Sequence, residues 1–132
     1  MNYWMVKTEP NSYSWDDFAQ KGEDVWDGVR NYQARNFLKE MKKGDPVLFY
    51  HSGKDKAVVG IALVSEEAFP DPKDQEWVAV RIKVKSKLKN PVSLAAIKAE
   101  DRLSEMLMLK QSRLSVMSVS KEEFDLILKM GS

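Results

Sequence analysis

The sequence predicts a mixed, mostly antiparallel α+β domain, a small curled barrel in which short strands alternate with short helices. Residues 77–87 are expected to form a strand with one buried face, with Val78, Val80, Ile82 and Val84 inward and Ala79, Arg81, Lys83 and Lys85 outward. Apolar residues from Ala34 to Met41 recur at the i, i+3, i+4 and i+7 spacing of an amphipathic helix. Glycines, prolines and polar clusters divide the rest into short segments, without an internal repeat, a low-complexity tract or a linker.

The first third of the chain gives one strand signal and two helix signals. Trp4 and Val6 share one face of the first strand, and Trp4 is expected in the core. Ser14 and Asp17 have the spacing of a capping box, which opens a short helix. In order, we expect a strand over 2–7, a helix over 15–20, a turn over 21–24, a loop over 26–31, and a helix from 34 that ends near 42–43 with Gly44 just beyond it.

The remaining elements follow from short apolar runs and the residues that separate them. Gly60 interrupts a strand and marks a bulge or a close backbone approach. Prolines at 70, 72 and 91 are expected to end strand pairing. In order, we expect strands over 47–50 and 57–64, a loop over 69–72, a strand over 77–87, a break at 90–91, helices over 94–99 and 104–110, a strand over 113–119, and a last helix opened by a capping box at 120–123.

Composition limits the classes of protein and site. The chain has 132 residues, of which 43% are hydrophobic and 31% charged, as in a single globular domain. With no cysteine and with His51 as the sole histidine, disulfides and thiolate metal sites are excluded and a zinc site is disfavoured. No apolar run reaches the ~20 residues of a membrane span. Without a basic leader, we expect no signal peptide and a cytoplasmic location.

Charge is unevenly distributed although the net charge is only +1. Between Glu9 and Asp27 the chain carries six acids and one base, Lys21. From Arg81 to Lys89 a cation stands at every second position. Such a stripe is typical of the solvated face of an antiparallel sheet, and it could also follow phosphates.

Residues 26–34 (WDGVRNYQA) form the least generic stretch of the chain. Trp26, Arg30 and Asn31 place an aromatic face, a guanidinium and an amide just before a helix, whose free N–H groups favour anionic or carbonyl ligands. These groups suit a nucleotide better than a metal or a lipid. In the alternative interpretation Trp26 fills the core while Arg30 and Asn31 only cap the helix.

Several stretches resemble the motifs of one known family, in the same order. They are YWMVKTEP over 3–10, YSWDD over 13–17, WDGVRNYQA over 26–34, YHS over 50–52, VGIA over 59–62, FPDP over 69–72 and RLSV over 113–116. On these motifs residues 1–132 are identified as a single EVE domain. The resemblance implies a PUA-like pseudobarrel of about five to six mostly antiparallel strands with flanking short helices. Relatives of this family, including the YTH domain, bind RNA or DNA and read modified bases.

The YTH domain allows a comparison at individual positions. Its first strand ends in Lys-Ser and a Trp-Ser-Thr loop precedes its helix, whereas here the corresponding pairs are Lys7-Thr8 and Trp26-Asp27. Trp77 falls where a second aromatic wall would stand. The resemblance thus implies a pocket for a flipped, methylated base. We expect its base-binding residues to be Lys7, Thr8, Glu9, Trp26, Asp27, Asn31, His51, Ser52 and Trp77, and its phosphate-binding residues to be Arg30 and Arg113.

The sequence therefore predicts a non-catalytic module whose partner is RNA or DNA carrying a modified base. We expect no cofactor, no metal and no membrane partner, and we assume a monomer. Two alternatives stay open: a pocket for a small anionic metabolite or nucleotide without a polymer, and a nucleotide hydrolase with His51 as general base. No nucleophile elbow, phosphate loop or metal-ligand spacing supports the hydrolase. His51 and Trp77 can equally be structural residues.

Overall fold

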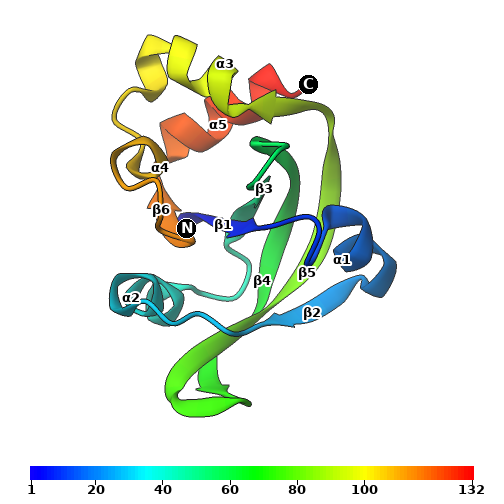
Figure 1. Cartoon of the computed structure of the whole chain (residues 1–132), viewed down its shortest axis with the longest axis vertical. Helices are drawn as coiled ribbons and strands as arrows, with labels where there is room; N and C mark the ends of the chain where they lie inside the picture. Colours follow the sequence, from blue (N-terminus) through cyan, green and yellow to red (C-terminus); the bar gives the residue numbers. More distant parts are fainter.

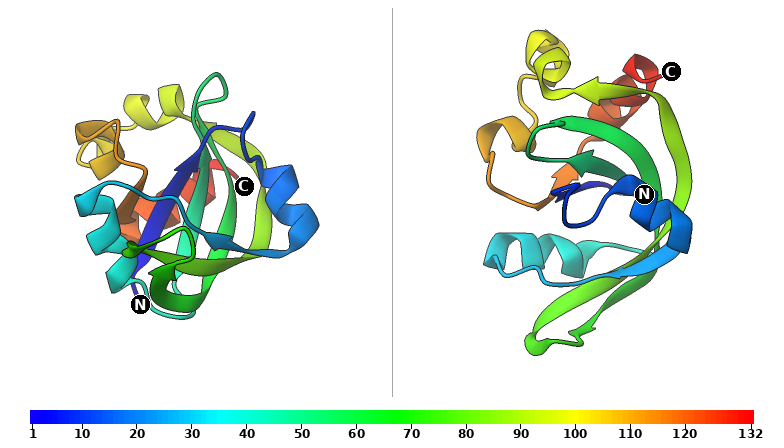
Figure 2. Two further views of the ribbon diagram at one scale, coloured as in Figure 1. Left: turned by 60° about the horizontal axis from the view of Figure 1, so that its bottom comes forward. Right: turned by 45° about the vertical axis from the view of Figure 1, so that its right-hand side comes forward.

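One six-stranded sheet organises the chain, with the strand order β2-β5-β4-β3-β1-β6 (Figure 1). The computed structural model describes all 132 residues. The strands are β1 (Tyr3–Thr8), β2 (Glu23–Trp26), β3 (Pro46–His51), β4 (Ala57–Asp71), β5 (Asp74–Ser93) and β6 (Val116–Val119). Only β1 and β3 pair in parallel, and the other neighbours are antiparallel. The sheet is strongly curved but not closed (Figure 2), and the expected mixed α+β fold is confirmed.

Short helices flank this sheet, and polar caps define where most of them begin. They are α1 (Trp15–Lys21), α2 (Tyr32–Glu40), α3 (Leu94–Ala99), the 3-10 helix η1 (Asp101–Leu103), α4 (Leu107–Lys110) and α5 (Lys121–Met130). Capping boxes at Ser14 and Ser120 are both formed, and Ser93 caps α3. A side-chain oxygen at these positions accepts a backbone N–H that the helix itself leaves free, so the three predicted helix starts are confirmed.

The first strand lies inside the sheet rather than at its edge. β1 runs parallel to β3, with Val6 opposite Phe49, and antiparallel to β6, with Tyr3 opposite Val119. Trp4 is buried, as expected, and its indole Nε1 donates a hydrogen bond of 2.9 Å to the Asp45 carboxylate. A strand paired on both sides and covered on both faces reads as a nearly continuous apolar run, which explains why Trp4, Met5 and Val6 are all buried.

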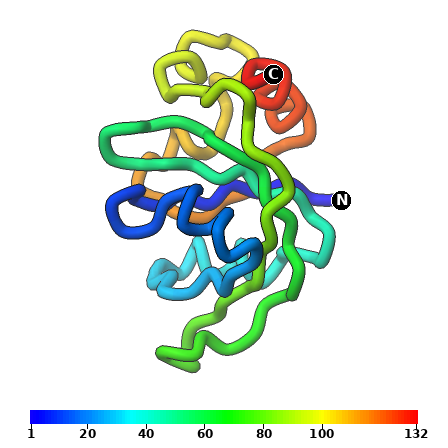
Figure 3. Tube along the Cα trace, turned by 90° about the vertical axis from the view of Figure 1, so that its right-hand side faces the viewer, coloured from blue at the N-terminus to red at the C-terminus, as the bar shows by residue number.

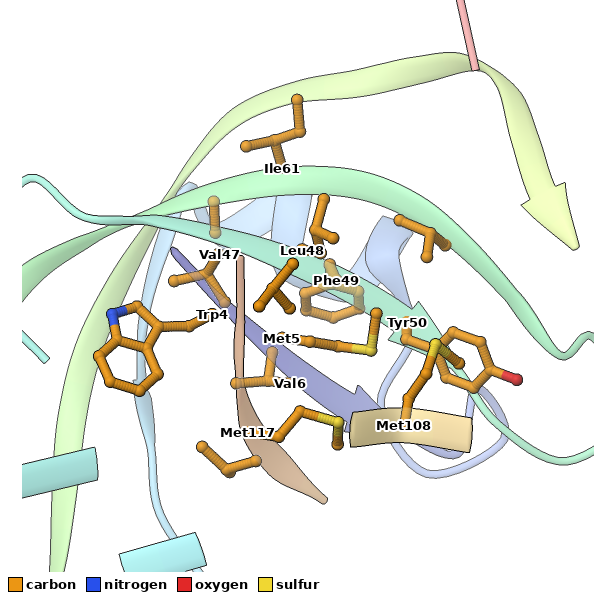
Figure 4. Packing of buried hydrophobic residues seen from close by; sticks show 14 of the residues in the cluster. Trp4, Met5, Val6, Val47, Leu48, Phe49, Tyr50, Ile61, Met108 and Met117 are labelled. Atoms are coloured by element: carbon orange, nitrogen blue, oxygen red, sulfur yellow. The ribbon is translucent and has the colours of Figure 1, made fainter. Parts of the chain in front are cut away.

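Every residue of β3 is buried, so the strand is covered on both faces of the sheet. Figure 4 shows Val47 to Tyr50 among the buried side chains around them. Phe49 stands at the centre of an aromatic cluster. Its ring stacks on Phe18 at 5.2 Å between centroids, and it meets the edges of Trp15 at 5.2 Å and Trp26 at 5.6 Å. Edge-to-face and offset-stacked pairs are favourable beyond the area they bury, so this cluster holds α1 and β2 against the centre of the sheet.

A long hairpin of β4 and β5 extends the sheet beyond its other strands, and Figure 3 follows it from its tip at 71–74 up to α3. The prediction of a loop over 69–72 is wrong for residues 69–71, which belong to β4, where Phe69 and Pro70 pair with Ala79 and Val78. β3 reaches only as far as Leu63 on β4, so Pro70 stands on a free edge where its missing N–H breaks no ladder bond.

The predicted break at 90–91 is also wrong, since β5 continues to Ser93. The register jumps from Gly60 opposite Lys87 to Val58 opposite Val92, which leaves Pro91 outside the ladder while the strand goes on. The Asn90 N–H instead donates to the Gly131 carbonyl at the end of α5, at 3.0 Å. A proline in such a bulge needs no sheet partner.

Four further elements differ from the prediction. Glu23–Trp26 is a strand rather than a turn leading into a loop, because pairing with β5 outweighs the weak strand propensity of its acids. α2 ends at Glu40, and the Lys42 N–H that follows donates to the Asp45 side chain. Gly44 (φ 95°) therefore belongs to the turn after the helix rather than to the helix end. α4 and β6 start three residues later than expected, at Leu107 and Val116.

Gly60 is both the expected bulge and the expected close approach. The β4 register shifts on either side of it, and a Cβ at this position would lie 2.5 Å from two ring carbons of Trp15. Trp15 is buried against Phe18 and Phe49 and has little room to move. We therefore expect Gly60→Ala to lower the free energy of unfolding by about 1–3 kcal/mol, measured by urea denaturation.

The control for this clash is a double-mutant cycle. In a Trp15→Leu background the smaller side chain leaves space for the new methyl group, so Gly60→Ala should cost much less there than in the wild type. An equal cost in both backgrounds would show that the ring is not what excludes a side chain at this position.

Candidate functional site

A cleft of about 260 Å³ opens at the end of β1, beside β2 and the loop before α1. Its lining residues come from three segments: Thr8 from β1, Tyr13 from the loop before α1, and residues 24–27 from β2 and its end. Of the nine residues predicted to bind a base, Thr8, Trp26 and Asp27 are brought together here. The end of a central strand thus supplies one wall of the cleft and the edge strand β2 supplies the other.

Hydrogen bonds fix the polar side of the cleft. The Thr8 hydroxyl donates to the Tyr13 carbonyl at 2.9 Å, which fastens the loop to β1. The Tyr13 hydroxyl donates to Asp24 at 2.6 Å, and Asp24 also accepts from the Val25 N–H and pairs with Lys21 at 3.2 Å. Both carboxylate oxygens of Asp24 therefore accept hydrogen bonds from within the chain, which fixes Asp24 in the wall of the cleft.

The same contacts change the pKa values of Tyr13 and Asp24. Burial, and then the hydrogen bond to Asp24, raise the pKa of Tyr13 above its ordinary value, so its hydroxyl stays protonated. For Asp24, burial opposes ionisation, but the hydrogen bonds from Tyr13, Val25 and Lys21 outweigh it and lower the pKa. The pair therefore keeps one proton donor and one carboxylate in a fixed arrangement over the ordinary range of pH.

The apolar side of the cleft consists of two aromatic rings. Trp26 is 9% exposed, so only one edge or face reaches solvent, and its ring centroid lies 6.2 Å from that of Tyr13 in an edge-on arrangement. Phe49 supports Trp26 from within the core. Trp26 is therefore both a core residue and a wall of the cleft, and the two interpretations made from the sequence are compatible.

Asp27 provides the remaining polar edge. Its carboxylate is 30% exposed and lies 3.7 Å from the Lys73 ammonium at the tip of the β4–β5 hairpin. A flat heterocycle in the cleft would meet an acceptor at Asp27 and a hydroxyl at Thr8. This arrangement can bind an aromatic ring that carries an amino group, because a carboxylate is an acceptor for exocyclic N–H groups.

Lys7 and Ser52 do not line this cleft. Successive side chains of a strand point to opposite faces, so Lys7 projects away from its neighbour Thr8 and lines a second cavity together with Ser52. Asn31 and Arg113 border a third hollow, of about 370 Å³, beside the start of α2. The Asn31 side-chain oxygen accepts the Ala34 N–H at 2.9 Å, so Asn31 is the cap of α2.

His51 is held on both sides of its ring. It is 8% exposed, Nε2 accepts the Trp15 N–H at 2.9 Å, and Nδ1 lies 3.0 Å from the Asp55 carboxylate. Since Nε2 accepts, Nδ1 carries the proton and donates to Asp55. Neither nitrogen faces the cleft. Glu9 is not among the residues that line the cleft, and its carboxylate lies against Gly53 of the β3–β4 connection.

Arg30 and Trp77 form a separate cluster at the start of α2. Arg30 is bound to the buried carboxylate of Asp71 at 2.9 Å, and its guanidinium lies 5.7 Å from the centre of the Trp77 ring. Trp77 packs on Tyr32 at 5.0 Å and on Arg35 at 5.4 Å. Trp77 is absent from the residues that line the cleft, so its assignment as a second wall stays a prediction.

Comparison with known proteins identifies the family. The sequence matches the EVE domain over residues 2–130. The chain belongs to the EVE domain family. Thymocyte nuclear protein 1 of Mus musculus is 33% identical, over 98% of this chain and 73% of that protein. A Rhodopseudomonas palustris protein solved by NMR is 47% identical, with a TM-score of 0.95 over 99% of this chain and 93% of that one. Human THYN1 protein, solved in complex with DNA containing 5-methylcytosine, is 29% identical, with a TM-score of 0.94 over 100% and 98% of the two chains.

Three residues that line the cleft of this EVE domain were missed from the sequence: Tyr13, Asp24 and Val25. Asp24 was not expected at the site because residues 21–24 were predicted to be a turn. Had Glu23–Trp26 been recognised as a strand, its two-residue alternation would have placed Asp24 on the same side as Trp26. Tyr13 carries no comparable signal, since its position depends on the loop that Thr8 fastens.

The structure shows neither a metal cluster nor a membrane-spanning helix. No three His, Cys, Asp or Glu side chains of this EVE domain gather as the ligands of a metal ion would. None of its helices has both the length and the apolar character needed to cross a bilayer.

Proposed function

We propose that this EVE domain is a nucleic-acid-binding module that takes a methylated base into the cleft that Tyr13 and Trp26 line. The observation that carries the proposal is the part of the Trp26 ring that reaches this cleft, which Phe49 supports from the core, with the Asp27 carboxylate and the Thr8 hydroxyl beside it. The complex of human THYN1 with DNA containing 5-methylcytosine supports the choice of ligand class. The proposal assigns no catalytic group, and His51 has no free nitrogen to act as a base.

The energetics of such binding are consistent with a weak but selective reader. Extrusion of a base from a strand costs a few kcal/mol, and stacking on an aromatic ring returns ~1–3 kcal/mol. A buried methyl group adds about 0.8 kcal/mol, which corresponds to about a fourfold preference for the methylated base. Asp27 can accept the exocyclic amino group of cytosine, so 5-methylcytosine suits both the apolar and the polar side of the cleft.

Asp27→Asn tests the polar edge without disturbing the core. A hydrogen bond to a charged acceptor contributes about 1.5–3 kcal/mol, so we expect the affinity for an oligonucleotide with one 5-methylcytosine to fall about tenfold or more. Fluorescence anisotropy would measure binding of single-stranded and duplex DNA and of RNA, each methylated and unmethylated. Asp16→Asn, an exposed carboxylate in the first turn of α1, is the matched control and should bind as the wild type does.

Trp26→Phe tests the apolar wall. Because Trp26 also belongs to the core, phenylalanine keeps part of the packing on Phe49, and circular dichroism should confirm that the variant folds. We expect the preference for the methylated base to decrease while binding of unmodified DNA changes less. If the wild type shows no preference for any methylated oligonucleotide, or if both variants bind as it does, the cleft is not a base-binding site.

A further inference from the structure

The largest cavity of the molecule, of about 510 Å³, lies on the other side of β1 from the Trp26 cleft. Three lysines line it: Lys7 from β1, Lys56 from the β3–β4 connection and Lys98 from α3. No Asp or Glu is among the residues that line this cavity, which we call the lysine pocket. Three cations on one concave surface favour the binding of an anion there, although the Glu9 carboxylate lies against Gly53, one of the lining residues.

None of these three lysines is part of an ion pair within the chain. The salt bridges of the protein involve other cations, whereas the Lys7 ammonium donates only to the Ser112 carbonyl, at 3.1 Å, and lies 5.5 Å from the Tyr50 ring. Burial lowers the pKa of Lys7, so its charge is partly desolvated without a carboxylate to compensate it. An external anion would supply that compensation.

Backbone hydrogen bonds hold the pocket together. The Leu94 N–H at the start of α3 donates to the Lys56 carbonyl at 2.7 Å, and the Ser52 N–H donates to the Thr8 carbonyl at 2.8 Å. Lys98 follows Leu94 by four residues, so both lie on one face of α3. The three ammonium groups therefore belong to segments whose backbones are already fixed, which reduces the entropy lost when a ligand binds.

The pocket also has an apolar wall. Leu94, Met108 and Leu109 line it beside the Tyr50 ring. Figure 4 shows Tyr50 and Met108 next to each other, with the Tyr50 hydroxyl pointing away from the other labelled side chains. Cations on one side and thioether, aliphatic and aromatic groups on the other fit a ligand that combines a phosphate with a sugar or a base.

We propose that the lysine pocket is a binding site for the phosphate group of a nucleotide-type ligand. That phosphate can come from the strand of a nucleic acid or from a free nucleotide. The first source rests on the proposed function, because Lys7 and Thr8 are neighbours on β1 that face the lysine pocket and the Trp26 cleft respectively. Ser112 is shared between the lysine pocket and the hollow at Asn31 and Arg113, so a basic surface continues toward α2.

Lys56 makes a selective test possible. Its φ of 43° is in the left-handed region, where a residue with a side chain is strained and glycine is not. Lys56→Gly therefore removes the charge and relieves the backbone strain at once. We expect this variant to unfold at the same temperature as the wild type or higher, so any loss of binding reflects the missing ammonium group rather than lost structure.

The first experiment titrates inorganic pyrophosphate and follows backbone amide shifts by NMR. We expect shifts at residues 53–56 and 94–98 in the wild type, their loss in a Lys56→Gly/Lys98→Gln variant, and their retention in Lys39→Gln. Lys39 is an exposed lysine of α2 that lines none of the cavities and serves as the matched charge control. No shifts at millimolar pyrophosphate, or equal shifts in the double variant, would overturn the proposal.

The second experiment separates the two sources. If the phosphate belongs to a strand, the double variant lowers the slope of log affinity against log salt by about 0.7 per lost contact for single-stranded DNA, with the methyl preference unchanged. If the ligand is a free nucleotide, the salt slope stays the same and binding of a nucleoside monophosphate is lost. Both outcomes support the lysine pocket. If pyrophosphate shifts the amide signals but no methylated oligonucleotide is preferred, the proposed function alone is refuted. If a methylated oligonucleotide is preferred but pyrophosphate shifts no amide signals, the lysine pocket alone is refuted.

Discussion

Asp71→Asn is expected to lower the free energy of unfolding by about 3 kcal/mol, because it breaks a buried ion pair and its hydrogen bonds. The Asp71 side chain is 0% exposed and accepts from the Arg30 guanidinium and the Gly28 N–H, both at 2.9 Å, and from the Lys73 N–H at 2.7 Å. These bonds tie the segment after Trp26 to the tip of the β4–β5 hairpin. Chemical denaturation measures the effect, and the exposed Asp74 provides the control, since Asp74→Asn should stay within about 0.5 kcal/mol of the wild type.

The same carboxylate should make stability depend on pH. Although burial opposes its ionisation, the hydrogen bonds from Arg30, Gly28 and Lys73 lower the pKa of Asp71 from 3.8 to about 2. A group whose pKa is lower in the folded state stabilises above its unfolded value and loses that contribution as pH falls through its folded value. We therefore expect the wild type to lose about 2 kcal/mol of its advantage over Asp71→Asn between pH 5 and pH 2. A difference that stays constant over this range would contradict the assignment.

Phe49→Ala is expected to lower the free energy of unfolding by about 3–5 kcal/mol, an effect of similar size. Phe49 is fully buried, and its removal leaves Phe18, Trp15 and Trp26 facing a cavity. Phe49→Leu keeps most of the volume and should cost less. Because Phe49 supports Trp26, Phe49→Leu is also expected to weaken the preference for a methylated oligonucleotide, although Phe49 itself does not line the cleft.

A double-mutant cycle separates support from general instability. Phe49→Leu and Trp26→Phe should couple by about 0.5 kcal/mol or more in unfolding measurements, since the two rings are in contact. If their effects simply add, and if Phe49→Leu leaves base preference intact, Trp26 is held by other neighbours and the supporting role of Phe49 is wrong.

The parts of the fold that the sequence predicted correctly are those with local causes. Ser14, Ser93 and Ser120 start helices through hydrogen bonds to residues three positions away, and residues 47–50 of β3 form a short apolar run. The errors arise where a segment is stabilised by pairing with a strand that is far away in the sequence. β2 exists because β5 lies beside it, and Pro70 is tolerated because β3 has already ended. The parallel pairing of β1 with β3 likewise has no local signal.

The candidate site shows the same division. The motif around Trp26 was found because an aromatic ring, a glycine and a guanidinium stand close together in sequence. Lys7 and Thr8 were assigned to one pocket since they are adjacent, although strand alternation sends them to different cavities. Arg30 was expected to bind phosphate, but the sequence could not reveal Asp71, its buried partner across the hairpin tip.

The central position of β1 has a consequence for synthesis on the ribosome. β1 emerges first, yet one of its two neighbours is β6, the strand made last, with Tyr3 opposite Val119. Until β6 is available, one long edge of β1 has no partner, while the β4–β5 hairpin can already form from residues adjacent in sequence. An unpaired edge is where nascent chains aggregate, so we expect chains stalled before Val116 to need chaperone protection that the complete sheet does not.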